Sequence, residues 1–220
     1  MNEIERRVLA RATELRATGG ENGEPRAIDG VAVKYNSRSE LLWDFYEEIA
    51  PCAFHNAFGA DADVRCLWSH SSDKPLGRTT AGTLALEDKA DGIHYRCDLP
   101  DTTTGRDAWV SIQRGDVTGV SFGFIVTKDA WRNEEGLIVR TVLEGELLEI
   151  SPVVFPAYPA ASVQARTLGS ERVTIPADVL RAQAADGGDS DGPAQVRMVT
   201  EHDRERDLQL RLIRGGSHAN

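Results

Sequence analysis

Cysteine is scarce in this sequence. Only three of the 220 residues are cysteines, namely Cys52, Cys66 and Cys97. Their number is odd and no two have C-x-x-C spacing, which argues against a disulfide framework and against the usual zinc patterns. Each is expected to be a small buried apolar residue, and we expect neither a metal nor a cofactor.

Long apolar runs are also missing. No stretch approaches the ~20 apolar residues that a membrane-spanning helix needs. Residues 1–7 lack the apolar core of a secretory signal. These absences predict a cytosolic chain with no membrane partner.

Positive charge is in short supply as well. The chain has 25 Lys and Arg residues against 35 Asp and Glu, a formal net charge of −10. Because binding to phosphates requires a positive face, we expect no nucleic-acid partner. Hydrophobic residues make up 40% of the chain, which is enough for one folded domain of ordinary size with segments left over at the ends.

The two ends differ in composition from the middle. Residues 1–25 are predicted to be an N-terminal helix and linker, because apolar residues recur at helical spacing over residues 3–17 and a glycine-rich stretch follows. Residues 167–220 are predicted to be a low-complexity, largely disordered tail, with an Ala/Gly/Asp/Ser-rich linker over 182–195. Within this tail, the charged residues 200–214 could form a helix with a weak apolar face.

The folded domain is predicted to span residues 26–166 and to be rich in short strands. Alternating or compact apolar segments separated by turns recur along it, at residues 27–33, 64–68, 82–87, 92–99, 120–126, 137–142 and 146–155. This spacing is typical of a β-barrel or sandwich. Two helices interrupt the strands, a short one over 51–58 and a clearer one over 105–114, with N-cap residues before it and Gly115 after it.

Ser121 is the candidate nucleophile. It lies in Thr118-Gly119-Val120-Ser121-Phe122-Gly123-Phe124, where glycines flank a single hydroxyl in an apolar, strand-forming stretch. Glycines leave room for a substrate carbonyl to approach. The G-x-S-x-G elbow of α/β-hydrolases needs a strand–turn–helix, whereas here the strand continues, so that fold is not expected.

A serine nucleophile also needs a base and an orienting acid. Among the five histidines (His55, His70, His94, His202 and His218), only His70 ends an apolar strand and opens a polar loop, 71–74; the alternative is a structural histidine. Glu149 interrupts an apolar run, 147–159, and is costly to bury unless it is paired. The alternative for Glu149 is an outward-facing strand position.

Eight separated motifs carry a family resemblance. In order they are Tyr35-Asn36-Ser37, Pro51-Cys52-Ala53-Phe54, Leu67-Trp68-Ser69-His70, Pro75-Leu76-Gly77-Arg78-Thr79, Gly82-Thr83-Leu84, Asp98-Leu99-Pro100-Asp101-Thr102, Arg114-Gly115-Asp116-Val117-Thr118-Gly119-Val120-Ser121-Phe122-Gly123-Phe124 and Glu149-Ile150-Ser151-Pro152-Val153. Over residues 30–166 the chain resembles the prohead maturation proteases of tailed bacteriophages. Cys52 departs from the glycine that is usual before Ala-Phe, and we expect this change to be tolerated.

The resemblance implies a mainly β fold with some helix (α+β), a herpesvirus-protease-like β-barrel flanked by short helices. It implies a serine endopeptidase with His70 as base and Ser121 as nucleophile. Glu149 is assigned as the orienting acid, since no histidine lies between Ser121 and the tail. Backbone N–H groups near Arg114 and Gly115 are candidates for the oxyanion hole.

The same resemblance implies the partners and the place of action. The substrates would be the major capsid protein precursor and its scaffold segment, with self-processing of the chain's own ends. Cleavage would take place in the host cytoplasm inside the assembling prohead, and a homo-oligomer is left open. Two alternatives remain at this point: a catalytically silent capsid-assembly or scaffold protein that keeps the protease fold, and an esterase or other hydrolase with the same triad.

Overall fold

The computed structural model describes residues 4–9, 15–20, 25–154 and 173–186. The chain divides into two compact units, Met1–Thr174 and Ile175–Asn220. The second unit contains helix α2 (Ala177–Asp186). This helix overlaps the start of the segment predicted to be a disordered linker, so that prediction is wrong for residues 182–186. The charged segment 200–214 lies outside the described residues.

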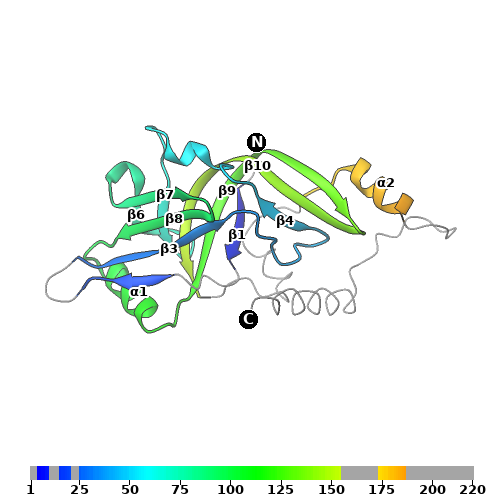
Figure 1. Cartoon of the computed structure of the whole chain (residues 1–220). Coiled ribbons are helices and arrows are strands. Elements are labelled where there is room, and N and C mark those ends of the chain that lie inside the picture. The colour runs from blue at the N-terminus through cyan, green and yellow to red at the C-terminus, as the bar shows by residue number, and fades with distance from the viewer. Residues whose placement is uncertain (1–3, 10–14, 21–24, 155–172, 187–220) are drawn as a thin grey trace, which may run out of the picture. The chain divides into compact units, whose positions relative to one another are not determined.

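The first unit contains a six-stranded sheet. Its order is β1 (Glu5–Leu9), β9 (Gly119–Glu134), β10 (Leu137–Val153), β5 (Arg65–Trp68) and β6 (Ser71–Arg78), and β4 (Tyr46–Ile49) also pairs with β10. Figure 1 shows β9 and β10 as one long hairpin through this sheet, which curls into a half-barrel. The predicted mainly β fold with few helices is confirmed.

The second sheet of this unit has four strands. Its order is β2 (Arg16–Thr18), β3 (Ala27–Lys34), β8 (Gly92–Asp98) and β7 (Leu84–Lys89). The helical elements are α1 (Thr103–Gln113) and the short 3-10 turns η1 (His55–Phe58) and η2 (Thr79–Ala81). Helix α1 is capped by Thr102, whose side chain accepts a hydrogen bond from the N–H of Gly105, in agreement with the predicted helix.

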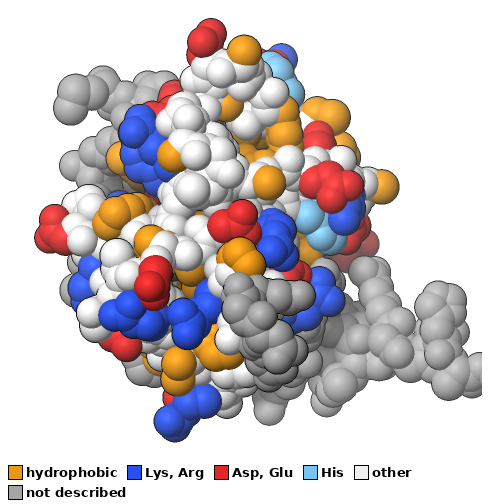
Figure 2. Space-filling view, turned by 90° about the vertical axis from the view of Figure 1, so that its left-hand side faces the viewer, with side chains coloured by type: hydrophobic (Ala, Val, Ile, Leu, Met, Phe, Trp, Pro, Cys, Tyr) orange, Lys and Arg blue, Asp and Glu red, His pale blue; other side chains and the backbone are white. Residues whose placement is uncertain are grey.

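The core follows from side-chain alternation along the strands. Val120, Phe122 and Phe124 are buried in one cluster with residues of both sheets. Because successive strand residues point to opposite faces, this alternation turns Ser121 and Gly123 to the other face of the six-stranded sheet. Away from the core, charged side chains of both signs are interspersed on the face shown in Figure 2.

The predicted N-terminal helix over residues 3–17 is wrong. Residues 5–9 form β1, which pairs antiparallel with β9, and residues 16–18 form β2, which pairs antiparallel with β3. The helical spacing of apolar residues reflects only a local preference. The hydrogen bonds that this segment forms with the edges of two sheets outweigh it. The short helix predicted over 51–58 is also reduced, to the 3-10 turn η1.

The cysteines divide into a buried pair and one exposed residue. Cys66 and Cys97 are buried as predicted, whereas Cys52 is exposed, so the prediction is wrong for that residue. Cys52 has a φ of 62°, in the left-handed region where glycine has no steric penalty. This conformation gives a physical reason for the glycine expected at this position from the family resemblance.

Candidate active site

His70 lies in a two-residue hairpin turn between β5 and β6. Trp68 pairs with Ser71 across the turn, and Ser69 and His70 have φ angles of 50° and 62°. Positive φ at both central residues is the requirement of a type I′ turn. The polar loop expected after His70 is therefore part of strand β6 instead, and the imidazole is presented at the tip of a tight, well-defined turn.

The turn is tied to strand β10. The N–H of Ser69 donates to the carbonyl of Pro152 at 3.2 Å, and the N–H of His70 donates to Oγ of Ser151 at 3.2 Å. Because Ser69 and His70 alone connect the two strands, the two hydrogen bonds hold the backbone of the turn and so position the His70 ring.

Glu149 of β10 is the partner of the His70 ring. Its Oε1 lies 2.6 Å from His70 Nδ1, and its side chain is 7% exposed. Ser151 Oγ donates to the other oxygen, Oε2, at 2.5 Å. Arg6 Nε of β1 also lies 3.3 Å from Oε1. The carboxylate is thus buried and held on both oxygens, which excludes the alternative of an outward-facing strand position.

Gly123 makes the room for this carboxylate. It pairs with Glu149 across the β9–β10 ladder, and a Cβ at position 123 would lie 2.8 Å from Glu149 Oε1. No larger residue fits without displacing the glutamate. Gly123, two residues after Ser121, therefore provides the space that the Glu149 side chain occupies.

Glu149 remains ionised in this setting. Burial by itself raises its pKa, but the hydrogen bond and charge of His70, the hydrogen bond from Ser151 and the charge of Arg6 outweigh burial, so the pKa lies below the ordinary glutamate value. An ionised carboxylate on Nδ1 favours the tautomer with the proton on that nitrogen. The other nitrogen, Nε2, is then free to accept a proton.

Ser121 is fully buried and pairs with Ser151 across the β9–β10 ladder. Ser151 in turn forms hydrogen bonds with the Glu149 carboxylate and with the backbone N–H of His70. In the described structure the Ser121 hydroxyl donates to the carbonyl of Arg7 at 2.8 Å. Among the described residues, His70 Nε2 is buried with no hydrogen-bond partner, which is an uncommon state for a buried polar atom.

The other residues considered for this chemistry lie elsewhere. His94 bonds Asp91 at 3.0 Å, and His55 is exposed in η1. The N–H groups of Arg114 and Gly115 donate to the carbonyls of Val110 and Ile112. Because both amides are used to end α1, the expectation that they form an oxyanion hole is wrong. His202 and His218 lie outside the described residues.

Three residues of the site were not predicted: Ser151, Arg6 and Arg7. Ser151 could have been found, because it follows Glu149 by two residues and so shares its face of the strand. Arg6 and Arg7 could not have been found in this role, since they were assigned to a helix and reach the site only through the pairing of β1 with β9.

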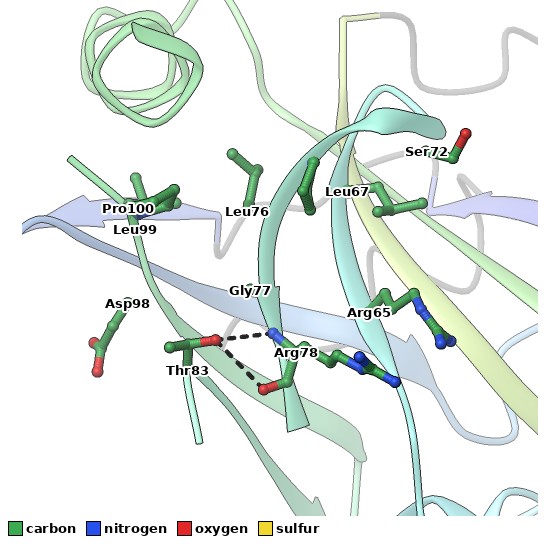
Figure 3. Close-up of a pocket in the computed structure, with 11 residues that line it drawn as sticks. Arg65, Leu67, Ser72, Leu76, Gly77, Arg78, Thr83, Asp98, Leu99 and Pro100 are labelled. Carbon is green, nitrogen blue, oxygen red and sulfur yellow. Dashed lines mark hydrogen bonds between the residues drawn. The ribbon is translucent and has the colours of Figure 1, made fainter. Parts of the chain in front are cut away.

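A cavity of about 580 Å³ adjoins the hairpin that carries His70 (Figure 3). Leu67 and Ser72, on either side of the turn, contribute to its wall, and Leu99 and Pro100 form an apolar part. In the close-up, the guanidinium groups of Arg65 and Arg78 lie at the lower end. The cavity therefore combines an apolar wall with two cationic side chains, both paired with Asp63.

The described residues show neither a membrane-spanning helix nor a metal cluster. None of their helices has both the length and the apolar character needed to cross a membrane. Within the same residues, no three His, Cys, Asp or Glu side chains are grouped as ligands of a metal ion would be.

Comparisons with known proteins identify what this chain is similar to. The family model described as caudovirus prohead serine protease matches residues 11–174. The prohead protease of Enterobacteria phage HK97 is 30% identical over 169 residues, which cover 75% of this chain and 70% of that protein. Among solved structures, the capsid assembly protease gp21 of bacteriophage T4 is similar with a TM-score of 0.47 and 13% identity, covering 70% of this chain and 98% of that one. The family match includes His70, Ser121 and Glu149 and leaves β1 outside.

Proposed function

Because the chain belongs to the caudovirus prohead serine protease family, it is a protease of phage capsid maturation, and we propose that Ser121, His70 and Glu149 are its catalytic triad. The observation that carries this proposal is the 2.6 Å contact between His70 Nδ1 and Glu149 Oε1, with Nε2 buried and unpartnered among the described residues. A carboxylate-oriented imidazole with an open acceptor nitrogen is what a serine nucleophile requires.

The reaction follows from these three side chains. Ser121 Oγ attacks the carbonyl carbon of the scissile peptide bond while His70 Nε2 takes the hydroxyl proton. The imidazolium that forms is stabilised by Glu149, and it then gives the proton to the leaving amine, which leaves an acyl-enzyme on Ser121. Water, deprotonated by the same imidazole, hydrolyses the ester and restores the serine.

The substrates in this proposal are the capsid protein precursor with its scaffold segment and the chain's own ends. Cleavage inside the assembling prohead would bring many copies of the enzyme and its substrates to a high effective concentration. Under these conditions one copy can cut the end of another, and a homo-oligomer is not required.

The test is incubation of the full chain with its capsid precursor, followed by mass spectrometry of the fragments. We expect defined fragments with the wild-type chain and none with Ser121→Ala. The matched control is Ser37→Ala, at an exposed serine, which should cleave like the wild type. Cleavage by Ser121→Ala at the wild-type rate would contradict the triad. If neither the wild type nor the Arg7→Ala chain, in which the contacts of β1 with Glu47 are removed, cleaves the precursor under any assembly condition, the silent scaffold is favoured instead.

We further propose that the cavity beside the His70 hairpin receives an apolar side chain of the substrate. Its apolar wall and its position next to the turn support this role. Ser72→Trp would fill the cavity and should raise KM several-fold with little change in kcat, because it removes binding rather than chemistry. Asp73→Trp is the matched control, since Asp73 is exposed and does not line the cavity. Equal effects of the two substitutions would exclude this subsite.

A further inference from the structure

Strand β1 occupies the edge of the nucleophile strand. Residues 5–9 pair antiparallel with residues 120–124, and Val8 lies opposite Ser121. In the order of the sheet β1 is the last strand on this side. The edge of β9 at the nucleophile is therefore a strand-binding surface, and a segment of the chain's own N-terminus fills it.

The main chain of β1 contacts the hydroxyl of Ser121 directly. The carbonyl oxygen of Arg7 accepts the hydrogen bond of the Ser121 hydroxyl at 2.8 Å. A hydroxyl has one proton to donate, so while Arg7 holds it the bond to His70 Nε2 is not made. This agrees with the unpartnered Nε2 among the described residues. The hydroxyl of Ser121 is thus blocked by β1 and is not activated by His70.

Side chains of β1 hold it in place from outside the triad. Arg7 Nε lies 2.6 Å from Glu47 Oε1, and Arg7 Nη2 lies 2.9 Å from Oε2 of the same residue. Glu5 is bound by Arg140 Nη1 at 2.8 Å. Arg7, Glu47 and Arg140 are all buried. This buried ionic cluster anchors β1 to β4 and β10, at a position separate from His70 and Glu149.

A third contact acts on the orienting acid. Arg6 Nε lies 3.3 Å from Glu149 Oε1, the oxygen that also contacts His70. With β1 seated, a second cation shares the carboxylate that should stabilise the imidazolium. Departure of β1 would release both the hydroxyl of Ser121 and this oxygen of Glu149.

We propose that the β9 edge at residues 120–124 binds an extended peptide substrate as an added antiparallel strand, and that β1 is an intramolecular stand-in for that substrate. Main-chain hydrogen bonds to an exposed sheet edge are an established mode of peptide recognition. This inference rests on the proposed function, because it takes Ser121 as the nucleophile. It adds that the chain as described is latent and opens when β1 leaves.

The first experiment measures access to Ser121 with a fluorophosphonate probe that labels activated serines. Arg7→Ala in the full chain removes the anchor to Glu47, and we expect labelling of Ser121 to be about 10- to 100-fold faster than in the wild type, since the open fraction rises as buried charged hydrogen bonds are lost. Arg16→Ala is the matched control: Arg16 lies on β2, its side chain is 70% exposed, and it pairs with Asp29. It should label at the wild-type rate.

The second experiment tests the edge as a peptide site. A synthetic peptide of residues 4–9, added to the Arg7→Ala chain, should bind the vacated edge and slow labelling towards the wild-type rate, whereas a peptide of the same composition in scrambled order should not. If Arg7→Ala does not fold, as judged by circular dichroism, Glu5→Ala replaces it. That variant removes only one carboxylate of the cluster and should give a smaller acceleration.

The outcomes separate the two proposals. If neither the wild type nor the opened variants label Ser121 above the Ser121→Ala background, the triad itself is wrong. If the wild type labels as fast as the opened variants, Ser121 is the nucleophile and the latency is wrong. If opening accelerates labelling but the peptide gives no protection, β1 is a cover and the edge is not a peptide site.

Discussion

Strands β1 and β10 flank β9, which carries the proposed nucleophile Ser121, and they act on this residue in opposite ways. On one side, β10 supplies Glu149 and Ser151, which hold the His70 ring and backbone. On the other side, β1 takes the hydroxyl of Ser121 through the Arg7 carbonyl and adds Arg6 to Glu149. The comparison indicates that the proposed catalytic geometry and its proposed closure are separable, since different strands and different ionic contacts support them.

The largest expected effect comes from substituting Ser121, on which both flanking strands act, or His70. In an opened chain such as Arg7→Ala, Ser121→Ala and His70→Ala should each lower kcat by about 10⁶-fold, and the double variant should be no worse than either single one, because the pair acts as a unit. Cleavage of the capsid precursor under single-turnover conditions measures this. Multiplying effects would mean that His70 is not the base for Ser121.

Glu149→Gln tests the β10 side next. Glutamine keeps a hydrogen-bond acceptor but loses the charge that stabilises the imidazolium, so we expect a loss of up to about 10⁴-fold in kcat. Single-turnover cleavage by the wild type and the variant measures this loss. Full activity of the variant would remove Glu149 from the triad.

Ser151→Ala should have a smaller effect on the same side. It removes one charge-assisted hydrogen bond to Glu149 and the acceptor of the His70 N–H, so kcat should fall about 10- to 100-fold with little change in KM. Ser151→Thr keeps the hydroxyl and should restore most of the rate. An effect on thermal unfolding alone, with kcat unchanged, would show that Ser151 only supports the fold.

The smallest expected effect is on the pH dependence of stability, and it compares Glu5 of β1 with Glu149 of β10. Burial raises the pKa of Glu5, but the hydrogen bonds and charges of Arg140 and Arg7 outweigh it, so this pKa, like that of Glu149, lies below the ordinary value, which is about 4.3. A lowered folded-state pKa contributes stability above the ordinary value, and this stability is lost as pH falls through the folded-state pKa.

We therefore expect the free energy of unfolding to fall below about pH 4.3, and to fall less steeply in Glu5→Gln and in Glu149→Gln, with differences of roughly 1–2 kcal/mol. Urea unfolding at neutral and acidic pH measures this for each variant. If Glu5→Gln has the same pH dependence as the wild type, the ionic anchor of β1 does not stabilise the closed state.

Much of the fold was readable from alternation along the chain. The buried strand residues Val120, Phe122 and Phe124 were recognisable from spacing alone, and α1 from its capping residues. The N-terminal segment was not, because a short charged stretch has no strong preference of its own. Its strand state comes from hydrogen bonds to β9, more than a hundred residues away in the sequence.

By itself, the sequence determined which residue types were available for this chemistry: one serine between glycines, one histidine at a strand end and one glutamate in an apolar run. Only the tertiary structure decided how they meet. Glu149 becomes the partner of His70 because β10 pairs with both β9 and β5. The closure of Ser121 by Arg7 likewise depends on sheet pairing, since a backbone carbonyl carries no sequence signal and its contacts arise only when distant strands come side by side.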